Sequence, residues 1–184
     1  MALEDPLLAL TLWQPWAWCI AHGTKRVENR EWPPPEALVG HRFAIHAGRH
    51  YDAAGVASLT ERRSALGLAP GEPPPEHEIV RGAIVAVATL AGAVRVTRRE
   101  TGAFMAKRWL GHLDSARIAM VERDPWTQGA WGWLLEDVVA IEPVSCTGNR
   151  KFWTVPAPLA EAVHAAEAAA RTQRHPAPIG SAPA

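Results

Sequence analysis

LTLWQPWAWCIAHGTKRVENR, the stretch of residues 10–30, decides the fold and the candidate site of this chain. Its first half is rich in indole rings: Trp13, Trp16 and Trp18. Its second half carries charges of both signs after a glycine: Lys25, Glu28 and Arg30. A nucleobase can stack on a flat ring while charged groups hydrogen-bond to its edge. The stretch therefore predicts a pocket for a planar, hydrogen-bonding ligand.

Local signals divide this stretch into a strand, a helix and a second strand. Residues 7–12 predict a short strand. Pro15 suits the first turn of a helix over residues 14–22, because a backbone N–H is not needed there. Gly23 is expected to end that helix in a left-handed conformation.

The second strand of the stretch, residues 25–31, raises a question of side-chain direction. Side chains alternate along a strand, so Lys25 and Glu28 would point to opposite faces. They share one pocket only if Lys25 lies in the turn before the strand begins. We expect that arrangement.

The rest of the chain predicts strands scattered among helices. Strands are expected at residues 41–47, 79–96, 131–141 and 151–155, and helices at residues 51–63 and 157–171. In the first of these strands, Phe43 and Ile45 should face the core and His46 a cleft or solvent. Residues 67–78 should form a mobile loop, and residues 104–122 a mixed region with a helix. This pattern argues for an α+β domain built around a mixed or barrel-like sheet.

Composition bounds the class of protein. The 184 residues suit one domain, and nineteen basic side chains balance nineteen acidic ones, which gives no reason for strong non-specific binding to duplex DNA. No apolar run could span a bilayer, and the first residues lack a signal-peptide pattern. Cys19 and Cys146 make neither a disulfide framework nor a zinc site, and the histidines show no zinc pattern. We expect a cytoplasmic protein without membrane contact, metal or cofactor.

Four segments, taken in order, resemble the ASCH domain (activating-signal-cointegrator homology), a family within the PUA-like group of small β-barrels. In the first segment, the hallmark G-x-K-x-x-E-x-R is matched by Gly23, Lys25, Glu28 and Arg30. The other segments are GHRFAIHA at residues 40–47, RGAIVAVATL at residues 81–90 and WGWLLEDVVAIEPVSCTGNRKFW at residues 131–153. The resemblance implies one ASCH domain over residues 1–172. Residues 173–184, which include three prolines and a glycine, are expected to form a disordered tail.

The resemblance also implies a fold and a range of functions. The fold would be a PUA-like mixed β-barrel with helices packed outside it and a cleft around the hallmark residues. ASCH domains are thought to bind RNA or DNA, often through a modified or extruded base. A few small bacterial relatives instead remove the acyl group from N4-acetylcytidine with a lysine, a threonine and a glutamate, and others have been proposed as ribonucleases. Lys25 matches that lysine, but Glu28 stands where the threonine would be.

In the leading interpretation, the hallmark side chains bind RNA, single-stranded DNA or a nucleoside. Glu28 accepts a hydrogen bond from an exocyclic amine, as carboxylates do with cytosine. Lys25 and Arg30 contact a phosphate or a carbonyl oxygen. Trp16 is the expected stacking platform, and His46 is expected to line the same cleft.

Two basic segments predict contacts to a nucleic-acid backbone. The expected contacts are Arg95, Arg98, Arg99, Lys107, Arg108, Arg150 and Lys151, and Arg117 lies in the same run as the first five. The alternative interpretation of the run is an ordinary solvated face. Only a phosphate-contacting surface would make binding fall steeply with salt.

Less specific interpretations remain open for the same residues. The hallmark charges would be a simple surface ion-pair network, worth about 0–1 kcal/mol per pair. Most of the tryptophans would be core, with Trp131, Trp133 and Trp153 in predicted strands. A hydrolase acting on N4-acylated cytidine or on RNA phosphodiesters would use Lys25 and Glu28 as catalytic residues. A protein-binding adaptor is the third alternative.

Overall fold

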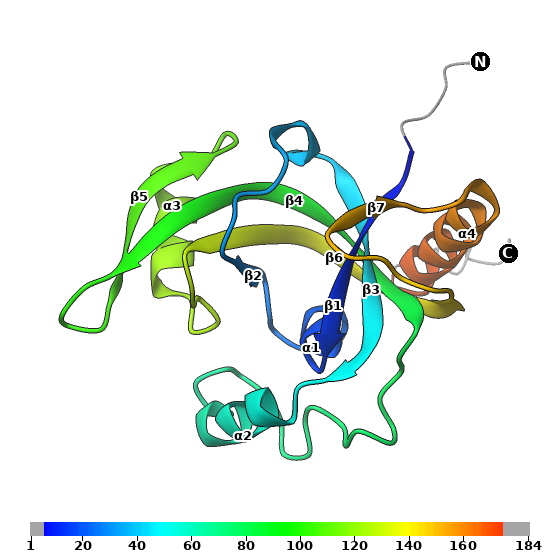
Figure 1. Ribbon diagram of the computed structural model, residues 1–184, viewed down its shortest axis with the longest axis horizontal. Coiled ribbons are helices and arrows are strands. Elements are labelled where there is room, and N and C mark those ends of the chain that lie inside the picture. Colours follow the sequence, from blue (N-terminus) through cyan, green and yellow to red (C-terminus); the bar gives the residue numbers. More distant parts are fainter. Residues whose placement is uncertain (1–5, 175–184) are drawn as a thin grey trace, which may run out of the picture.

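A seven-stranded sheet, curled into half of a barrel, forms the centre of the protein (Figure 1). The computed structural model describes residues 6–174. The strands are β1 (Leu8–Gln14), β2 (Val27–Arg30), β3 (Arg42–Tyr51), β4 (Ala83–Arg98), β5 (Phe104–Leu110), β6 (Trp131–Ser145) and β7 (Phe152–Thr154). They lie in the order β2-β6-β4-β3-β1-β7, with β5 added to β4. β1 is parallel to β3 and the other pairs are antiparallel, which confirms the expected α+β class with a mixed, barrel-like sheet.

The described residues form four α-helices: α1 (Trp16–Ala21), α2 (Ala53–Arg62), α3 (Ser115–Arg123) and α4 (Ala157–Arg174). α1, α3 and α4 pack on the sheet, whereas Leu59 of α2 packs against Cys19 of α1 and Trp126. Strand alternation gives the sheet two apolar faces. Phe43 and Ile45 join a cluster that includes Ile20 of α1, as expected for core-facing positions of β3. Ala44 points the other way and shares a cluster with Val163 of α4. The two helices therefore pack on opposite faces of the sheet.

The region of residues 104–122 is a strand followed by a helix. β5 pairs with the end of β4, and α3 begins after Asp114, whose side chain accepts a hydrogen bond from the backbone N–H of Arg117 at 2.8 Å. The sequence prediction missed this strand because basic residues obscure the alternation of β5. Phe104 and Ala106 nevertheless pack beside α3.

Gly23 does not have the left-handed conformation that the sequence predicted for it. Its φ angle is not in the left-handed region, and the residue before it, His22, ends α1 in a helical conformation. A glycine is needed here for space, because a Cβ would lie 2.9 Å from the carbonyl oxygen of Cys19. Residues 173 and 174, which the sequence assigned to a disordered tail, belong to α4, which continues to Arg174. Residues 175–184 lie outside the described part of the chain.

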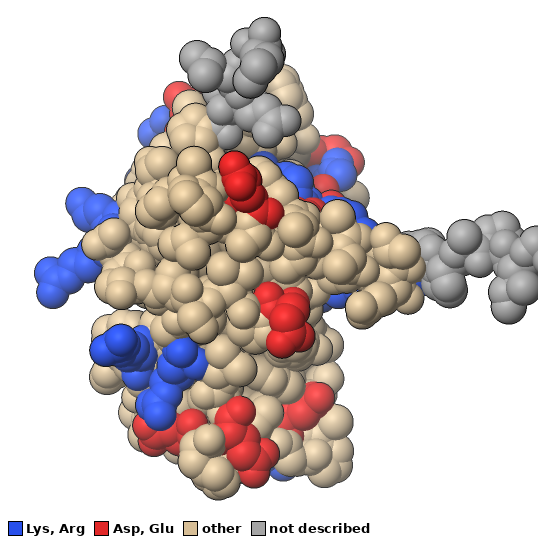
Figure 2. Space-filling view, turned by 90° about the vertical axis from the view of Figure 1, so that its right-hand side faces the viewer, with Lys and Arg blue, Asp and Glu red and all other residues tan. Residues whose placement is uncertain are grey.

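An ion-pair network fastens α4 to the sheet. Arg42 on β3 contacts Asp137 on β6 at 2.6 Å and Glu167 on α4 at 2.7 Å. Arg171 on α4 pairs with both carboxylates. On the face of the molecule that carries α4, acidic and basic side chains are interspersed on a mostly uncharged surface (Figure 2). No helix within residues 6–174 is long and apolar enough to cross a membrane.

The attachment of α4 should weaken in acid. Hydrogen bonding to Arg171, together with the charge of Arg42, lowers the pKa of Asp137. A carboxyl whose pKa is lower in the folded state stabilises the fold above its unfolded pKa of about 3.9, and this stabilisation is lost as the pH falls through the folded pKa. We expect urea titrations between pH 7 and pH 2 to show a smaller loss of stability below about pH 4 in Asp137→Asn than in the parent. Parallel curves for the two proteins would contradict this role of Asp137.

Candidate functional site

The three charged hallmark side chains form one buried cluster. Lys25 Nζ lies 3.0 Å from Glu28 Oε2, and Arg30 Nε lies 3.1 Å from Glu28 Oε1. Only 2% of the Lys25 side chain, 8% of Glu28 and 19% of Arg30 are exposed. The cluster is therefore not an exposed network of surface ion pairs.

The turn between α1 and β2 brings Lys25 to Glu28. β2 begins at Val27, so Lys25 precedes the strand, as the sequence predicted. The backbone N–H of Lys25 donates to the carbonyl of Cys19 at 3.1 Å, and its Nζ donates to the carbonyl of Val27. Arg26 closes the same turn by donating to the carbonyl of Gly23 at 3.1 Å. The ammonium of Lys25 is held in place by the backbone as well as by Glu28.

Two adjoining hollows open onto this cluster. The first, which we call the Lys25 hollow, has a volume of about 200 Å³ and is lined by residues that include Trp16, Lys25, Glu28, Asn29, Ser58 and Trp126. The second, the Arg30 hollow, has a volume of about 260 Å³ and is lined by residues that include Trp13, Trp16, Glu28, Asn29 and Arg30. Both hollows are lined by Trp16, Glu28 and Asn29. Glu28 thus lies in a wall that the two hollows share.

Trp16 is fixed against α2. Its indole Nε1 donates to Asp52 Oδ2 at 3.1 Å, and Asp52 also caps α2 by accepting from the backbone N–H of Gly55 at 2.9 Å. Gly55 has to be a glycine, because a Cβ would lie 2.5 Å from Cζ2 of Trp16. The half-buried ring is therefore a rigid wall of both hollows.

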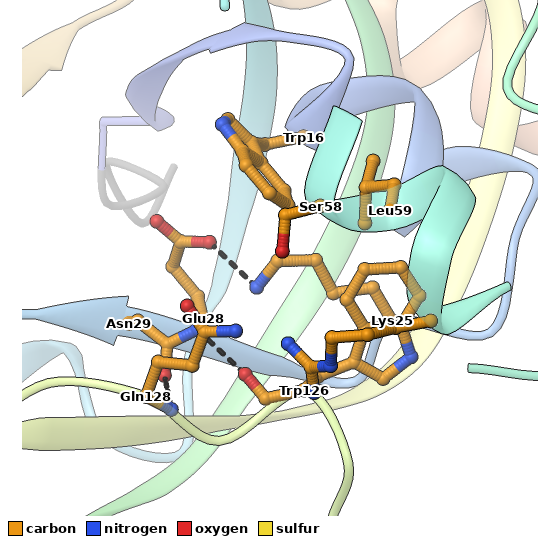
Figure 3. Close-up of a pocket in the computed structure, with 9 residues that line it drawn as sticks. Trp16, Lys25, Glu28, Asn29, Ser58, Leu59, Trp126 and Gln128 are labelled. Atoms are coloured by element: carbon orange, nitrogen blue, oxygen red, sulfur yellow. Dashed lines mark hydrogen bonds and ion pairs between the residues drawn. The ribbon is translucent and has the colours of Figure 1, made fainter. Parts of the chain in front are cut away.

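Trp126 and Asn29 complete the Lys25 hollow. The Trp126 indole donates to Thr24 Oγ1 at 3.2 Å, and its ring centroid is 6.0 Å from Lys25 Nζ, within the range of a cation–π contact. Asn29 donates to the carbonyl of Trp126 at 2.8 Å and accepts from the backbone N–H of Gln128 at 2.7 Å. In Figure 3, Lys25 and Glu28 meet in the middle of the pocket, with Trp16 on one side and Asn29 and Gln128 on the other. Asn29 thus holds the Trp126 loop against β2.

The electrostatics of the cluster favour a ligand with a negative or carbonyl oxygen. Two cations share one carboxylate in a mostly dry environment, where unpaired charge is costly. Burial raises the pKa of the nearby Asp124, while a hydrogen bond from the Trp126 N–H and the charge of Lys25 oppose this rise. Burial also raises the pKa of the Cys19 thiol to about 12, so this cysteine is no nucleophile at neutral pH.

His46 lies apart from the predicted cleft. It is buried on β3, where its Nε2 hydrogen-bonds to the carbonyl of Cys146 at 3.2 Å and its ring packs edge-on against Trp153. The expectation of a cleft or solvent position was incorrect because the segment after β6 covers the ring, so closely that a Cβ on Gly148 would lie 2.3 Å from it. Burial lowers the pKa of His46, which favours the neutral imidazole. None of the hollows described here is lined by it.

The predicted basic run is divided by the structure. Arg95, Arg98, Lys107 and Arg108 are exposed on the β4–β5 hairpin, and Arg99 follows β4. Arg117, by contrast, pairs with Glu136 at 2.8 Å. The exposed residues Arg150 and Lys151 precede β7, so they belong to a different part of the surface from the hairpin.

Several pocket residues were not anticipated from the sequence. They are Asn29, Asp52, Ser58, Arg62, Trp126 and Gln128. Asn29 lies between Glu28 and Arg30 on β2, so its position in the sequence could have marked it as a pocket residue. Trp126 and Asp52 come from distant segments, and no local pattern marks them. Trp131, Trp133 and Trp153 are buried, as the sequence predicted.

Fold and pocket together define a class: an α+β domain with a half-barrel sheet and a buried charge cluster at its β2 edge. The sequence profile of the ASCH domain family matches residues 10–144, and the protein belongs to that family.

Solved structures of ASCH proteins are similar to this chain. The crystal structure of ASCH from Zymomonas mobilis has 15% sequence identity and a TM-score of 0.45, and the match covers 87% of this chain and 94% of that chain. Two mutant forms of the same protein show 16% identity over 88% of this chain and 98% of theirs, with TM-scores of 0.45 and 0.46. No curated protein matches this sequence.

Proposed function

We propose that this ASCH domain binds single-stranded RNA or DNA by taking one base into the Lys25 hollow, where Glu28 and Lys25 read its edge. The observation that carries this proposal is the position of Glu28. Its buried carboxylate lies in the wall between two hollows, beside the fixed indole of Trp16. ASCH domains are generally RNA-binding, which supports the same conclusion.

The chemistry of the pair suggests which bases fit. Each oxygen of Glu28 forms an ion pair with one cationic side chain, and a carboxylate oxygen has lone pairs left for a ligand N–H. The ammonium of Lys25 donates to the Val27 carbonyl and forms an ion pair with Glu28, which leaves a hydrogen for a ligand acceptor. A base that presents an exocyclic amine beside an acceptor matches this arrangement. Cytosine and adenine carry that amine, whereas uracil does not.

The volumes of the hollows agree with a small planar group. Pockets for drug-sized ligands begin at about 300 Å³, and the Lys25 hollow has about 200 Å³. One ring system therefore fits, with the sugar and phosphate left outside. Stacking a base on an aromatic ring contributes about 1–3 kcal/mol.

Calorimetric titration with cytidine, adenosine, N4-acetylcytidine and uridine at low salt tests the proposal. We expect binding of cytidine or adenosine and at least about tenfold weaker binding of uridine, since the missing amine leaves Glu28 unmatched. Absence of binding by all four nucleosides at high micromolar concentration would refute the base pocket.

The same N4-acetylcytidine samples test the hydrolase alternative. The pair of Lys25 and Glu28 at 3.0 Å is the observation that keeps this alternative open. Chromatography after incubation would reveal cytidine if the acyl group were removed. Product from the parent but not from Lys25→Ala would make the protein an enzyme, and equal product from both would remove Lys25 from any mechanism.

A further inference from the structure

A row of arginines crosses the sheet directly beside the pocket. Arg30 on β2 pairs with Trp131 on β6, Trp131 pairs with Arg95 on β4, and Arg95 pairs with Arg108 on β5. Residues directly opposite one another in antiparallel strands point to the same face. Arg30, Arg95 and Arg108 therefore lie on one face, in a line perpendicular to the strands. We call these three residues the arginine row.

The row has cationic groups available for a ligand. Arg95 and Arg108 are exposed, and neither forms an ion pair with any carboxylate of residues 6–174. Like charges placed directly opposite in a sheet destabilise the pair. The protein nevertheless places two arginines opposite each other next to its pocket. A negatively charged partner would relieve that repulsion.

The spacing of the row suits a polymer better than a single anion. Neighbouring strands lie about 4.8 Å apart, so Arg95 stands about 10 Å and Arg108 about 14 Å from Arg30 along the sheet. One phosphate cannot reach all three positions, whereas successive phosphates of a strand can. Arg30 itself contacts Glu28, so the row begins at the base pocket.

Trp32 offers a second ring at the pocket end of the row. Its side chain is exposed, and its ring centroid lies 5.4 Å from Cζ of Arg30. The Trp133 indole donates to the Trp32 carbonyl at 3.2 Å and so anchors its backbone. Exposed aromatic rings interleaved with cations are typical of surfaces that bind single-stranded nucleic acid.

We propose that the arginine row is the phosphate track of a single-stranded polynucleotide, whose backbone crosses β6, β4 and β5 while one base occupies the Lys25 hollow. This inference rests on the proposed function and adds the path of the bound strand: its phosphates lie along Arg30, Arg95 and Arg108. A neighbouring base stacks on Trp32. Beyond the pocket the track contacts no base edge, and stacking on Trp32 accepts any base, so the track carries no further sequence preference.

Arg98 provides a matched control because it belongs to the same hairpin but faces the other way. It pairs with Phe104, whose ring packs beside α3 on the opposite face of the sheet. There it lines a third hollow of about 900 Å³, which shares Arg62 and Gln128 with the Lys25 hollow. This Arg98 hollow is the alternative path for the nucleic-acid strand. Comparing Arg98→Gln with the double variant therefore distinguishes this path from the arginine row.

The experiment uses cytidine, single-stranded cytidine tetranucleotides as RNA and as DNA, and a blunt DNA duplex as probes. Each probe is titrated into the parent, Arg95→Gln/Arg108→Gln and Arg98→Gln. We expect both tetranucleotides to bind the parent more tightly than cytidine does. In the double variant, tetranucleotide affinity should fall about 25-fold at 0.1 M salt, and the slope of log K against log salt should fall by about 1.4. Cytidine affinity should stay unchanged in that variant, and Arg98→Gln should bind every probe as the parent does.

Four results would overturn the track. If the parent binds the tetranucleotides no more tightly than cytidine, the phosphate track is refuted, while the base pocket is still supported. A loss in Arg98→Gln with none in the double variant moves the strand to the Arg98 hollow. Tighter binding of a blunt duplex than of either single strand excludes a single-stranded ligand. A parent that binds none of the probes refutes the proposed function together with the track.

Discussion

Replacing Glu28 with glutamine should destabilise the protein by about 3–5 kcal/mol and abolish its preference for amine-bearing bases. The carboxylate is the only charge that compensates Lys25 and Arg30 within the described ion-pair network of the pocket. Glutamine keeps the size of the side chain but removes its charge, so the buried ammonium of Lys25 loses the carboxylate with which it forms its ion pair. Urea unfolding at pH 7 measures the loss, and calorimetry with cytidine measures the binding.

Glu31→Gln is the matched control for this substitution. Glu31 follows the same strand and is exposed, so losing its charge should change stability by less than about 0.5 kcal/mol. A second variant, Lys25→Met combined with Glu28→Gln, removes the uncompensated ammonium. It should recover part of the stability without recovering binding. Equal stability of Glu28→Gln and Glu31→Gln would show that the cluster is effectively solvated.

The hallmark cluster could be predicted because it is local. Lys25, Glu28 and Arg30 lie within six residues of one another, and a tight turn followed by a short strand limits where their side chains point. The remaining uncertainty was whether Lys25 precedes the strand. The hydrogen bond from the Lys25 N–H to the carbonyl of Cys19 settles that point.

The walls of the pocket could not be predicted in the same way. Trp126 reaches Lys25 from a loop about a hundred positions along the chain, and Asp52 orients Trp16 from the cap of another helix. Such pairings depend on tertiary packing, which no local pattern encodes. His46 shows the complementary error. The alternation of side chains correctly placed His46 on the opposite face of β3 from Phe43 and Ile45. Both faces of β3 are covered, however, so His46 is buried.

The arginine row illustrates how much depends on register. The sequence marks Arg95, Arg98 and Arg108 alike, as parts of one basic run. Strand pairing places Arg95 and Arg108 beside Arg30 and sends Arg98 to the opposite face. A change of register by one residue would exchange these faces. The functional division of the run is thus a property of the sheet.

Trp133 contacts both the core and the site, and Trp133→Ala should lower the free energy of unfolding by about 3–5 kcal/mol. Its side chain is fully buried and stacks on Phe152 with ring centroids 5.7 Å apart. It is the register partner of Glu28 on the neighbouring strand. Its ring centroid also lies 6.0 Å from Cζ of Arg30, so the ring supports the guanidinium that pairs with Glu28.

The milder substitution Trp133→Phe separates these two roles. Phenylalanine retains a ring for stacking on Phe152 but has no indole N–H to hold the Trp32 carbonyl. We therefore expect a smaller loss of stability, about 1–3 kcal/mol, in urea unfolding. If the arginine row and Trp32 act together, tetranucleotide binding should weaken more than cytidine binding. The exposed Trp109 serves as a control, because Trp109→Ala removes an indole from β5 and should change stability by less than about 0.5 kcal/mol. A Trp133→Ala protein as stable as Trp109→Ala would contradict the central position assigned to this ring.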